Sequence, residues 1–303
     1  MAFAHDSKEK IVVDYFSNHI GSTAPRQLTL AWKALGYAPQ DLSELELPFS
    51  NDELMKVIDS MPIDKAPGPD GFTGKFYKSC WGIIKEDILL ALNSLYMMNA
   101  QGLQLLNTAN IVLLPKKGDA TEITDYRPIS LIHSVAKIFT KLLANRLAPR
   151  LDAMISNCQS AFIKKRSIHD NFMYVQNTVR TLQKLKMPAL FLKLDIQKAF
   201  DTINWSYLLE IMQALGFGPR WREWISILFR TSTSTPLLNG QRCPDFGHRR
   251  GRLLELATAQ GILSALPAST AKWRISMYAD DANPIKSDLD AINMILHSFG
   301  SAS

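Results

Sequence analysis

Residues 273–281 read WRISMYADD, an alternating stretch that ends in two adjacent carboxylates. Apolar and polar residues alternate with the period of a strand, so Asp280 would leave the strand on its less apolar face. By itself, a pair of acids at a strand end is typical of a solvated turn. Held rigidly together, the two like charges repel unless a cation lies between them. A further carboxylate nearby would therefore change the interpretation from a turn to a metal site.

A second strand with an acidic end supplies that carboxylate. Residues 187–196 read MPALFLKLDI, and this stretch alternates so that Asp195 also emerges on the less apolar face. Two such strands side by side would bring Asp195 and Asp280 together. Hard divalent cations are bound by a few carboxylates together with substrate phosphates. Paired metals about 3.5–4 Å apart hold the attacking and leaving oxygens of a phosphoryl displacement.

Both stretches belong to an ordered set of motifs that resembles one protein family. FLKLDIQKAFD at 191–201 and YADD at 278–281 resemble the two acidic motifs of reverse transcriptases. The surrounding motifs resemble those of LINE-type (non-LTR) retrotransposons, particularly the plant elements, and the resemblance runs from about Leu45 to the last residue. These further motifs are KAPGPDGF at 65–72, IVLLPKK at 111–117, DYRPISL at 125–131 and QSAFIKKRSI at 159–168.

The mixture of helices with a few separated strands favours an α+β fold. The resemblance implies the right-hand polymerase fold, with fingers and palm only: helices packed on a small antiparallel palm sheet, and no thumb. We expect residues 1–50 to be a helical lead-in and residues 51–303 to be a partial reverse transcriptase domain. Within that domain, the fingers would span about 51–185 and the palm about 186–303. By the resemblance, we expect the chain to stop before a thumb and to carry no endonuclease at its front.

The resemblance also implies a catalytic site. Asp195 and Asp280 are the expected metal ligands, Asp281 is the next, and the backbone carbonyl of Ile196 would complete one coordination sphere. Two Mg²⁺ (or Mn²⁺) ions are expected in an intact site. The implied activity is that of an RNA-directed DNA polymerase, in which a primer 3′-hydroxyl attacks the α-phosphate of a deoxynucleotide. Asp201, six residues beyond Asp195, is interpreted as a cap or an ion-pair partner rather than a ligand.

The expected partners are an RNA template, a DNA primer and deoxynucleoside triphosphates. Phe200 would abut the sugar of the incoming nucleotide by resemblance, although an ordinary core phenylalanine before a helix fits equally well. The other candidate contacts are Lys116, Lys117, Arg127, Gln159 and Arg166. The two lysines would bind the triphosphate, or they are turn lysines without a role. Arg127 and Arg166 would contact template phosphate or base planes. Gln159 is a candidate because it is the first residue of the motif at 159–168.

The net charge of +6 is concentrated in one segment. Residues 111–166 hold ten basic and four acidic residues, so this segment carries the whole excess. Concentrated basic charge indicates a polyanionic partner. A solvated helix face is the alternative interpretation.

Composition excludes several classes of protein. The 303 residues are 47% hydrophobic, enough for one large domain or two small ones. No run of 18 apolar residues suggests a membrane span, and the N-terminus does not resemble a secretory signal. The three cysteines form no CxxC pair and the histidines show no paired spacing, so no zinc site is expected. An intracellular location, nucleus or cytoplasm, is expected.

Local signals predict the main elements. Ser50 and Glu53 have capping-box spacing at a helix start, and Pro62 should close that helix. A helix packed on the core is expected at 81–98 from the helical spacing of Ile83, Ile84, Ile88, Leu92, Leu95 and Tyr96. Further helices are expected at 135–147, 168–185, 205–215 and 220–229. A short strand is expected at 111–114. The turn-rich loop at 66–74 lacks the Lys-Ser or Lys-Thr of a Walker loop.

The resemblance fails in two places. Relatives carry a Gln-Gly-Asp-Pro loop and a helix between the two acidic strands, whereas this chain passes from Gly251 to Gly261 without most of that segment. Pro284 stands in the expected return strand, where it cannot donate to a ladder. We therefore expect this copy to be inactive. A non-catalytic nucleic-acid-binding remnant and a decayed product without function are the alternatives.

Overall fold

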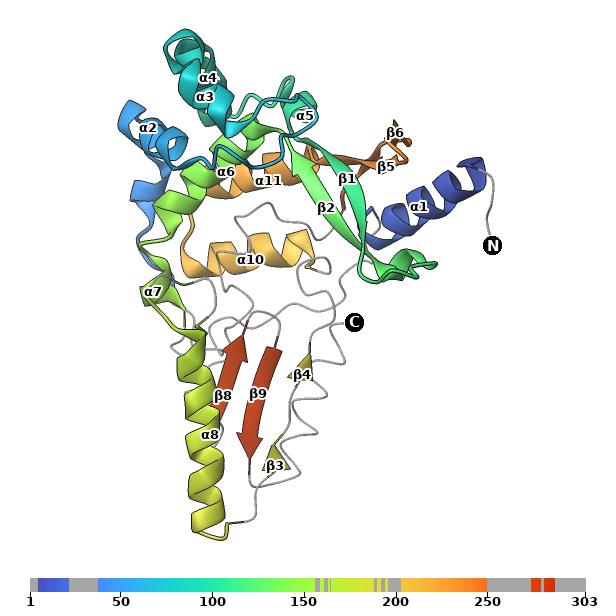
Figure 1. Cartoon of the computed structure of the whole chain (residues 1–303). Coiled ribbons are helices and arrows are strands. Elements are labelled where there is room, and N and C mark those ends of the chain that lie inside the picture. Colours follow the sequence, from blue (N-terminus) through green and yellow to red (C-terminus); the bar gives the residue numbers. More distant parts are fainter. Residues whose placement is uncertain are drawn as a thin grey trace. The chain divides into compact units, whose positions relative to one another are not determined.

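The computed structural model describes residues 5–21, 38–155, 159–160, 163, 165–187, 190–191, 194–195, 203–249, 274–278 and 281–286 (Figure 1). Its helices and strands confirm the predicted α+β class. The chain divides into two compact units. The first takes Met1–Lys33, Tyr37–Leu147 and Phe200–Leu256, and the second takes Ala34–Gly36, Ala148–Ala199 and Ala257–Ser303. The predicted boundaries near residues 50 and 185 stay predictions about domain organisation.

The first unit combines helices with one mixed sheet. Its helices are α1 (His5–His19), η1 (Ser43–Glu46), α2 (Asn51–Ser60), α3 (Gly74–Ser79), α4 (Trp81–Tyr96), α5 (Leu103–Leu106), η2 (Ile123–Asp125), α6 (Ser134–Leu147), α10 (Trp205–Leu215) and α11 (Pro219–Arg230). Its strands are β1 (Thr108–Pro115), β2 (Tyr126–Ile132), β5 (Thr233–Leu238), β6 (Gln241–Arg242) and β7 (Phe246–Gly247).

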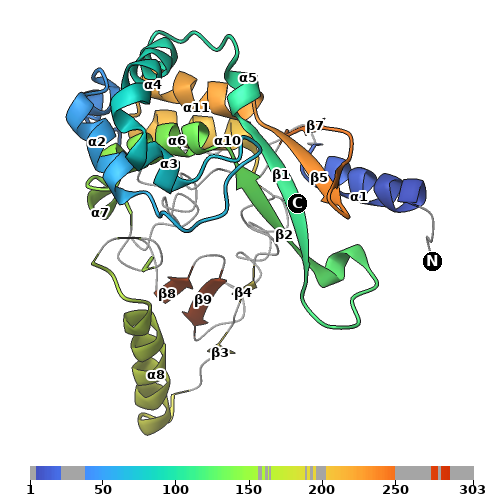
Figure 2. The same ribbon diagram turned by 45° about the horizontal axis from the view of Figure 1, so that its top comes forward.

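The sheet of the first unit is built around β1. Strands β1 and β2 pair antiparallel, with Ala109 opposite Ile132 and Pro115 opposite Tyr126, and they lie side by side in Figures 1 and 2. On its other edge β1 pairs in parallel with β5, from Thr108 opposite Thr233, and β5 pairs antiparallel with β6 and β7. The sequence predicted a short strand at 111–114. It did not indicate the parallel partner, which lies 125 residues further along the chain, because that pairing is non-local.

Local signals placed the helices well. Ser50 and Glu53 form the predicted capping box, and α2 ends at Ser60, two residues before Pro62. Gly216 takes a left-handed φ of 97° at the end of α10, as its position after the helix predicted. The prediction for α4 was partly wrong, because Ile83 is 83% exposed and only one face of the helix packs on the core. That face carries Ile88, Leu92 and Leu95.

The core lies under α6, α10 and α11, which neighbour one another in Figures 1 and 2. Trp221 and Trp224 of α11 are fully buried, and their rings meet at 6.2 Å between centroids. The carboxylate of Glu46 accepts a 2.7 Å hydrogen bond from the backbone N–H of Trp221. This bond satisfies an otherwise unpaired donor in the first turn of α11. It also places a negative charge at the positive end of the helix dipole, where the interaction is favourable.

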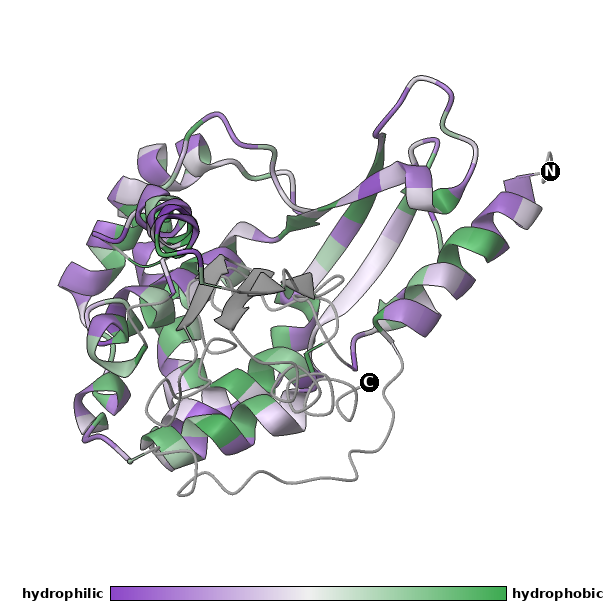
Figure 3. Cartoon of the chain, turned by 90° about the horizontal axis from the view of Figure 1, so that it is seen from below, coloured by the Kyte–Doolittle hydropathy of each residue, from purple (hydrophilic) through white to green (hydrophobic). Residues whose placement is uncertain are grey.

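Helix α1 packs on the sheet rather than standing apart as a loose lead-in. Its Val12 and Phe16 form a buried cluster with Ile111 of β1 and Phe246 of β7. Hydrophobic and hydrophilic patches alternate along α1 near the N label in Figure 3. Burial is also the main reason why the pKa of the Cys243 thiol is raised, and the charge of Glu9 on α1 raises it further.

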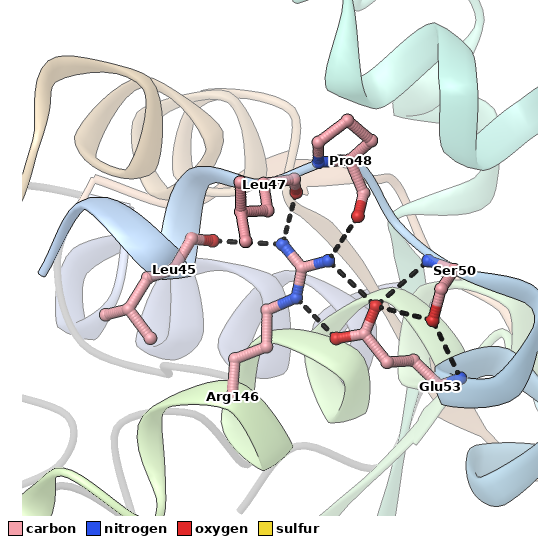
Figure 4. A network of polar contacts seen from close by, with 6 residues as sticks. All are labelled: Leu45, Leu47, Pro48, Ser50, Glu53 and Arg146. Atoms are coloured by element: carbon pink, nitrogen blue, oxygen red, sulfur yellow. Dashed lines mark hydrogen bonds and ion pairs between the residues drawn. The ribbon is translucent and has the colours of Figure 1, made fainter.

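One arginine joins α6 to the segment before α2 (Figure 4). Arg146 Nε and Nη2 donate to the two carboxylate oxygens of Glu53 at 2.6 and 2.8 Å. Its Nη1 donates to the carbonyls of Leu45 and Leu47, and Nη2 donates to that of Pro48. The guanidinium also lies 4.5 Å from the ring centroid of Phe49. With 8% of its side chain exposed, Arg146 uses its fork of donors inside the protein.

The same network predicts a pH dependence of stability. Hydrogen bonding to Arg146 is the largest cause that lowers the pKa of Glu53 from 4.5 to about 2. A carboxyl whose pKa is lower in the folded state stabilises the fold above its unfolded pKa. That stabilisation is lost as the pH falls from about 4.5 towards 2. Because Glu53 is partly exposed, we expect a contribution of about 1–2 kcal/mol. Urea unfolding of wild type and Glu53→Gln at pH 7 and pH 3 should show the two proteins converging at the lower pH.

The second unit holds the two acidic strands. Its helices are α7 (Leu151–Met154) and α8 (Ile168–Lys184), and its strands are β3 (Leu190–Phe191), β4 (Leu194–Asp195), β8 (Arg274–Tyr278) and β9 (Asp281–Lys286). Strand β9 is central: β8 pairs along one edge, and β3 and β4 pair along the other, all antiparallel. Helix α8 packs against β8. These pairings agree with the predicted small antiparallel sheet.

The expectation that Pro284 disturbs the return strand was wrong. Strand β9 runs through Pro284, which stands opposite Ile275 of β8. On the other edge of β9, β4 pairs at 281–282 and β3 pairs at 285–286. The pairings on that edge therefore lie before and after Pro284.

Among the helices of the described residues, none combines the length and the apolar character that crossing a bilayer requires.

Candidate functional site

Acidic residues meet in one row across the sheet of the second unit. Asp195, the last residue of β4, stands opposite Asp281, the first residue of β9, and Asp281 stands opposite Tyr278 on its other side. The next row contains Leu194, Ala282 and Met277. The register thus separates a polar row at the strand ends from an apolar row behind it. Directly opposed like charges destabilise an antiparallel pair unless something compensates them.

The strand order differs in one respect from the expectation. The sequence suggested that the strand before Tyr278 lies beside the strand of Asp195, but β9 lies between β8 and β4. Only two residues separate β8 from β9, so the two strands form an antiparallel hairpin, and β9 is its inner strand. The carboxylate that the register places opposite Asp195 therefore belongs to Asp281. Asp280, Ile196, Phe200 and Asp201 lie outside the described residues.

The residues of this row fit a hard divalent cation. Carboxylate oxygens are the ligands that Mg²⁺ prefers, and protein sites for this ion use one or two carboxylates with substrate phosphates. Among the described residues there is no group of three histidine, cysteine, aspartate or glutamate side chains that could hold a metal by themselves. The predicted ligand set includes Ile196 and Asp280, and these residues lie outside that part of the chain.

The loop of the β1–β2 hairpin carries the candidate triphosphate ligands in the first unit. Lys116 Nζ donates to the carbonyl of Thr124 at 2.8 Å, and Lys117 Nζ lies 3.0 Å from Asp125 Oδ1. The bond from Lys117 is the first reason why the pKa of Asp125 is lowered. Both lysines thus have partners inside the loop, and Lys117 remains 52% exposed. A phosphate would have to compete with these bonds.

Arg127 differs from the two lysines. It follows this loop as the second residue of β2 and stands opposite Leu114. Its side chain is exposed, and no hydrogen bond or ion pair joins it to another residue that the structure describes. A guanidinium offers a planar fork of donors to phosphate. Unlike the two lysines, Arg127 would not have to give up a bond to a described residue in order to bind one.

Arg166 is engaged within the second unit. Its guanidinium donates to Asp152 Oδ1 at 2.8 Å and to the carbonyls of Gln159, Ile155 and Asp152. The side chain is 11% exposed, and Gln159 is 2% exposed. The predicted contact of Arg166 with a template stays a prediction, and so does the candidate contact at Gln159. In the structure, Arg166 binds the carbonyl of Gln159 and carbonyls at the end of α7.

The structure changes the meaning of the basic segment at 111–166. Arg146 was counted there as part of a polyanion footprint, yet its donors bind Glu53 and three carbonyls. Charge counting alone could not separate it from an exposed arginine. Its place four residues after Leu142 and three after Leu143, both buried, was the one available signal that it lies near the inner side of α6.

Comparison with known proteins adds independent evidence. Residues 114–299 match the family model described as "Reverse transcriptase (RNA-dependent DNA polymerase)". A transposon TX1 uncharacterized 149 kDa protein of Xenopus laevis is 30% identical over 276 residues, which cover 85% of this chain and 21% of that protein. A retrovirus-related Pol polyprotein from type-1 retrotransposable element R1 of Bradysia coprophila is 30% identical over 54% of this chain and 16% of its own length.

A third relative is the RNA-directed DNA polymerase from mobile element jockey of Drosophila melanogaster. It is 28% identical over 55% of this chain and 20% of its own length. The chain thus spans about a fifth or less of these relatives. The matched family segment covers more than half of the chain and includes both acidic strands of the sheet. The chain belongs to the reverse transcriptase family, and its domain is related to those of non-LTR retrotransposons of the jockey, R1 and R2 types.

Proposed function

We propose that this chain is the fingers-and-palm part of an RNA-directed DNA polymerase from a plant-type LINE element, in a copy that has lost synthesis. One observation carries the assignment of the site: Asp195 stands opposite Asp281 at the ends of paired strands. Family membership supplies the reaction, transfer of a deoxynucleotide to a primer 3′-hydroxyl. The proposed location is intracellular, in the nucleus or cytoplasm where a template RNA is available.

In an intact site, Asp195, Asp280, Asp281 and the carbonyl of Ile196 would hold two Mg²⁺ or Mn²⁺ ions. When bound, such ions supply activation of the attacking hydroxyl and neutralise charge that develops on the phosphate. The chain's own part would be to hold Asp195 and Asp281 at opposed register positions on two paired strands, β4 and β9. Phe200 would exclude a 2′-hydroxyl at the sugar of the incoming nucleotide. Lys116, Lys117 and Arg127 would bind its triphosphate.

The loss of synthesis rests on the shortened segment between Gly251 and Gly261. Pro284 does not account for the loss, because strand β9 runs through this residue. In relatives the missing loop and helix support the nascent base pair and pack under the catalytic strands. Without them, the reacting atoms would not be held in line.

A non-catalytic nucleic-acid-binding remnant is the second candidate function, and the basic segment at 111–166 favours it. The two candidates share one partner, a single-stranded nucleic acid, and differ in whether chemistry follows binding. A decayed product with neither activity would bind nothing.

Binding of single-stranded RNA or DNA is therefore expected, weak and with little sequence preference. Affinity should fall steeply with salt, because each neutralised phosphate releases counterions, with a slope of about −0.7 per contact for single strands. Replacing Lys164 and Lys165 by alanine should weaken binding to all sequences alike and reduce the slope by about 1.4. Arg166 is left unchanged in this test, because its guanidinium holds Asp152 and neighbouring carbonyls.

The matched control is Lys184→Ala, which removes an exposed lysine at the end of α8 in the same unit. Fluorescence anisotropy of a labelled oligonucleotide across a salt series measures both the affinity and the slope. Absence of binding at low salt would contradict both candidate functions. An equal effect of Lys184→Ala would show that Lys164 and Lys165 act only through net charge.

A further inference from the structure

The loop between α2 and α3 in the first unit is closed and tightly packed. Its two ends touch, because a Cβ on Gly74 would collide with the carbonyl oxygen of Pro62. Its middle is pressed against the end of β2, where a Cβ on Gly68 would collide with the backbone of Ile132. Gly71, with a φ of 75°, takes a conformation that a side chain would strain. A surface loop of this length with its ends in contact is frequently a functional loop.

Asp70 fixes the backbone of Phe72, which lies at the end of this loop, two residues before α3. Asp70 Oδ1 accepts a 3.2 Å hydrogen bond from the backbone N–H of Phe72, and Oδ2 lies 3.1 Å from Nδ1 of His133. On the other side, Ser134 Oγ donates to the carbonyl of Phe72 at 3.0 Å. Burial and then the charge of Asp70 raise the pKa of Tyr77 to about 12, so this tyrosine is neutral at physiological pH.

The ring of Phe72 is exposed even though its backbone is held. It is 45% exposed, and it stacks on Phe76 with 4.2 Å between centroids and 25° between planes. Phe76 in turn meets Tyr77 edge-on at 5.5 Å and 87°, and Tyr77 is 3% exposed. Three rings thus run from the interior to the surface. The outermost, Phe72, is stacked on Phe76 and is the most exposed of the three.

Two lysines accompany this ring in sequence. Lys65 lies in the loop and Lys75 in the first turn of α3, and both are exposed. Neither makes a hydrogen bond or ion pair with another residue in the described ranges. Lys78 contrasts with them, since its Nζ donates to the carbonyl of Asp59 at 2.8 Å. Asp64 is the exposed acid of the loop, and Asp70 is largely covered.

We propose that Phe72 is a stacking platform for one base of a single-stranded nucleic acid, with Lys65 and Lys75 on the adjoining phosphates. An aromatic face beside cationic side chains is the combination that binds single strands without sequence preference, because every base has a π-face. A duplex hides those faces, so the platform selects unpaired strands. The inference rests on the proposed function, since it takes the same polyanionic partner and assigns it a contact outside the acidic site.

The test measures binding of a short fluorescein-labelled single-stranded RNA by anisotropy. Phe72→Leu keeps an apolar side chain of similar volume and removes the π-face, so it should lower affinity by about 5- to 150-fold. Phe72→Trp should retain or improve binding. Ile83→Ala removes an 83% exposed apolar side chain from α4 of the same unit and should leave affinity unchanged. An abasic sugar-phosphate chain should bind wild type and Phe72→Leu equally weakly.

The outcomes separate this proposal from the proposed function. If Phe72→Leu binds the RNA like wild type, or if the abasic chain binds wild type as tightly as RNA does, the platform is wrong while salt-dependent binding still stands. If Phe72→Leu changes the sedimentation of the protein and leaves RNA affinity alone, the ring is a protein contact and the proposal fails. If wild type binds no RNA at low salt, both fail. If the platform effect is seen and polymerisation is absent even with the missing segment restored, the platform holds and the polymerase assignment fails.

Discussion

Replacing Arg146 by methionine is expected to lower the free energy of unfolding of the first unit by about 2–4 kcal/mol. The substitution keeps most of the apolar stem and removes every donor of the fork. Glu53 then remains as a partly buried carboxylate without its cation, and the carbonyls of Leu45 and Pro48 lose their partner. Breaking a buried ion pair from one side costs more than the pair contributes, because the remaining charge is uncompensated.

Two further variants sharpen the expectation about Arg146. Arg146→Lys keeps the charge but presents a point charge on a flexible stem, so it should recover only a part of the loss. Lys141→Met removes an exposed charge from the same helix and should stay within about 0.5 kcal/mol of wild type. Urea unfolding followed by tryptophan fluorescence reports on the first unit through the buried Trp221 and Trp224. Equal midpoints for Arg146→Met and Lys141→Met would contradict the structural role of this arginine.

The sequence predicted most elements of the fold because their signals are local. The capping box at Ser50 and Glu53, the glycine after α10 and the helical spacing of α6 each depend on residues a few positions apart. What it could not predict is non-local. The parallel pairing of β1 with β5 and the packing of α1 on Phe246 join residues far apart in the chain. Periodicity also failed for Ile83, since a helix pattern does not say which apolar residue lacks a partner.

Prediction of the candidate site divides in the same way. The motifs identified the two acidic strands, and the strands do lie in one antiparallel sheet. The predicted order, with β8 beside β4, was wrong, since β9 lies between them. Alternation within a strand does not indicate which strand of a hairpin pairs with a third strand. Charge counting did not distinguish Arg146 and Arg166, whose guanidinium groups bind the chain itself, from the exposed Arg127. Exposure and hydrogen bonding decide that difference.

The unaltered chain is expected to incorporate no more deoxynucleotide than its Asp195→Asn variant in a primer-extension assay with Mg²⁺ or Mn²⁺. Carboxylates at the right register do not by themselves make a polymerase. The reacting atoms must be held in line, and a misplacement of about 1 Å costs about a hundredfold in rate. By the resemblance, the loop and helix that we expect to be missing between Gly251 and Gly261 would supply that positioning for the template–primer pair.

A chimera tests the same argument from the other side. Inserting the Gln-Gly-Asp-Pro loop and helix of a relative between Gly251 and Gly261 should raise incorporation by about a hundredfold or more. Asp195→Asn within the chimera should abolish it, because the substitution removes the carboxylate charge opposite Asp281 that we propose holds the metal. If the unaltered chain incorporates deoxynucleotides and Asp195→Asn does not, the chain is a working reverse transcriptase and the shortened segment is dispensable. If the chimera stays inactive, the missing segment does not explain the loss, and binding without chemistry becomes the better description. The strand that runs through Pro284 strengthens the expectation of rescue, since the sheet that carries the carboxylates already forms without the insert.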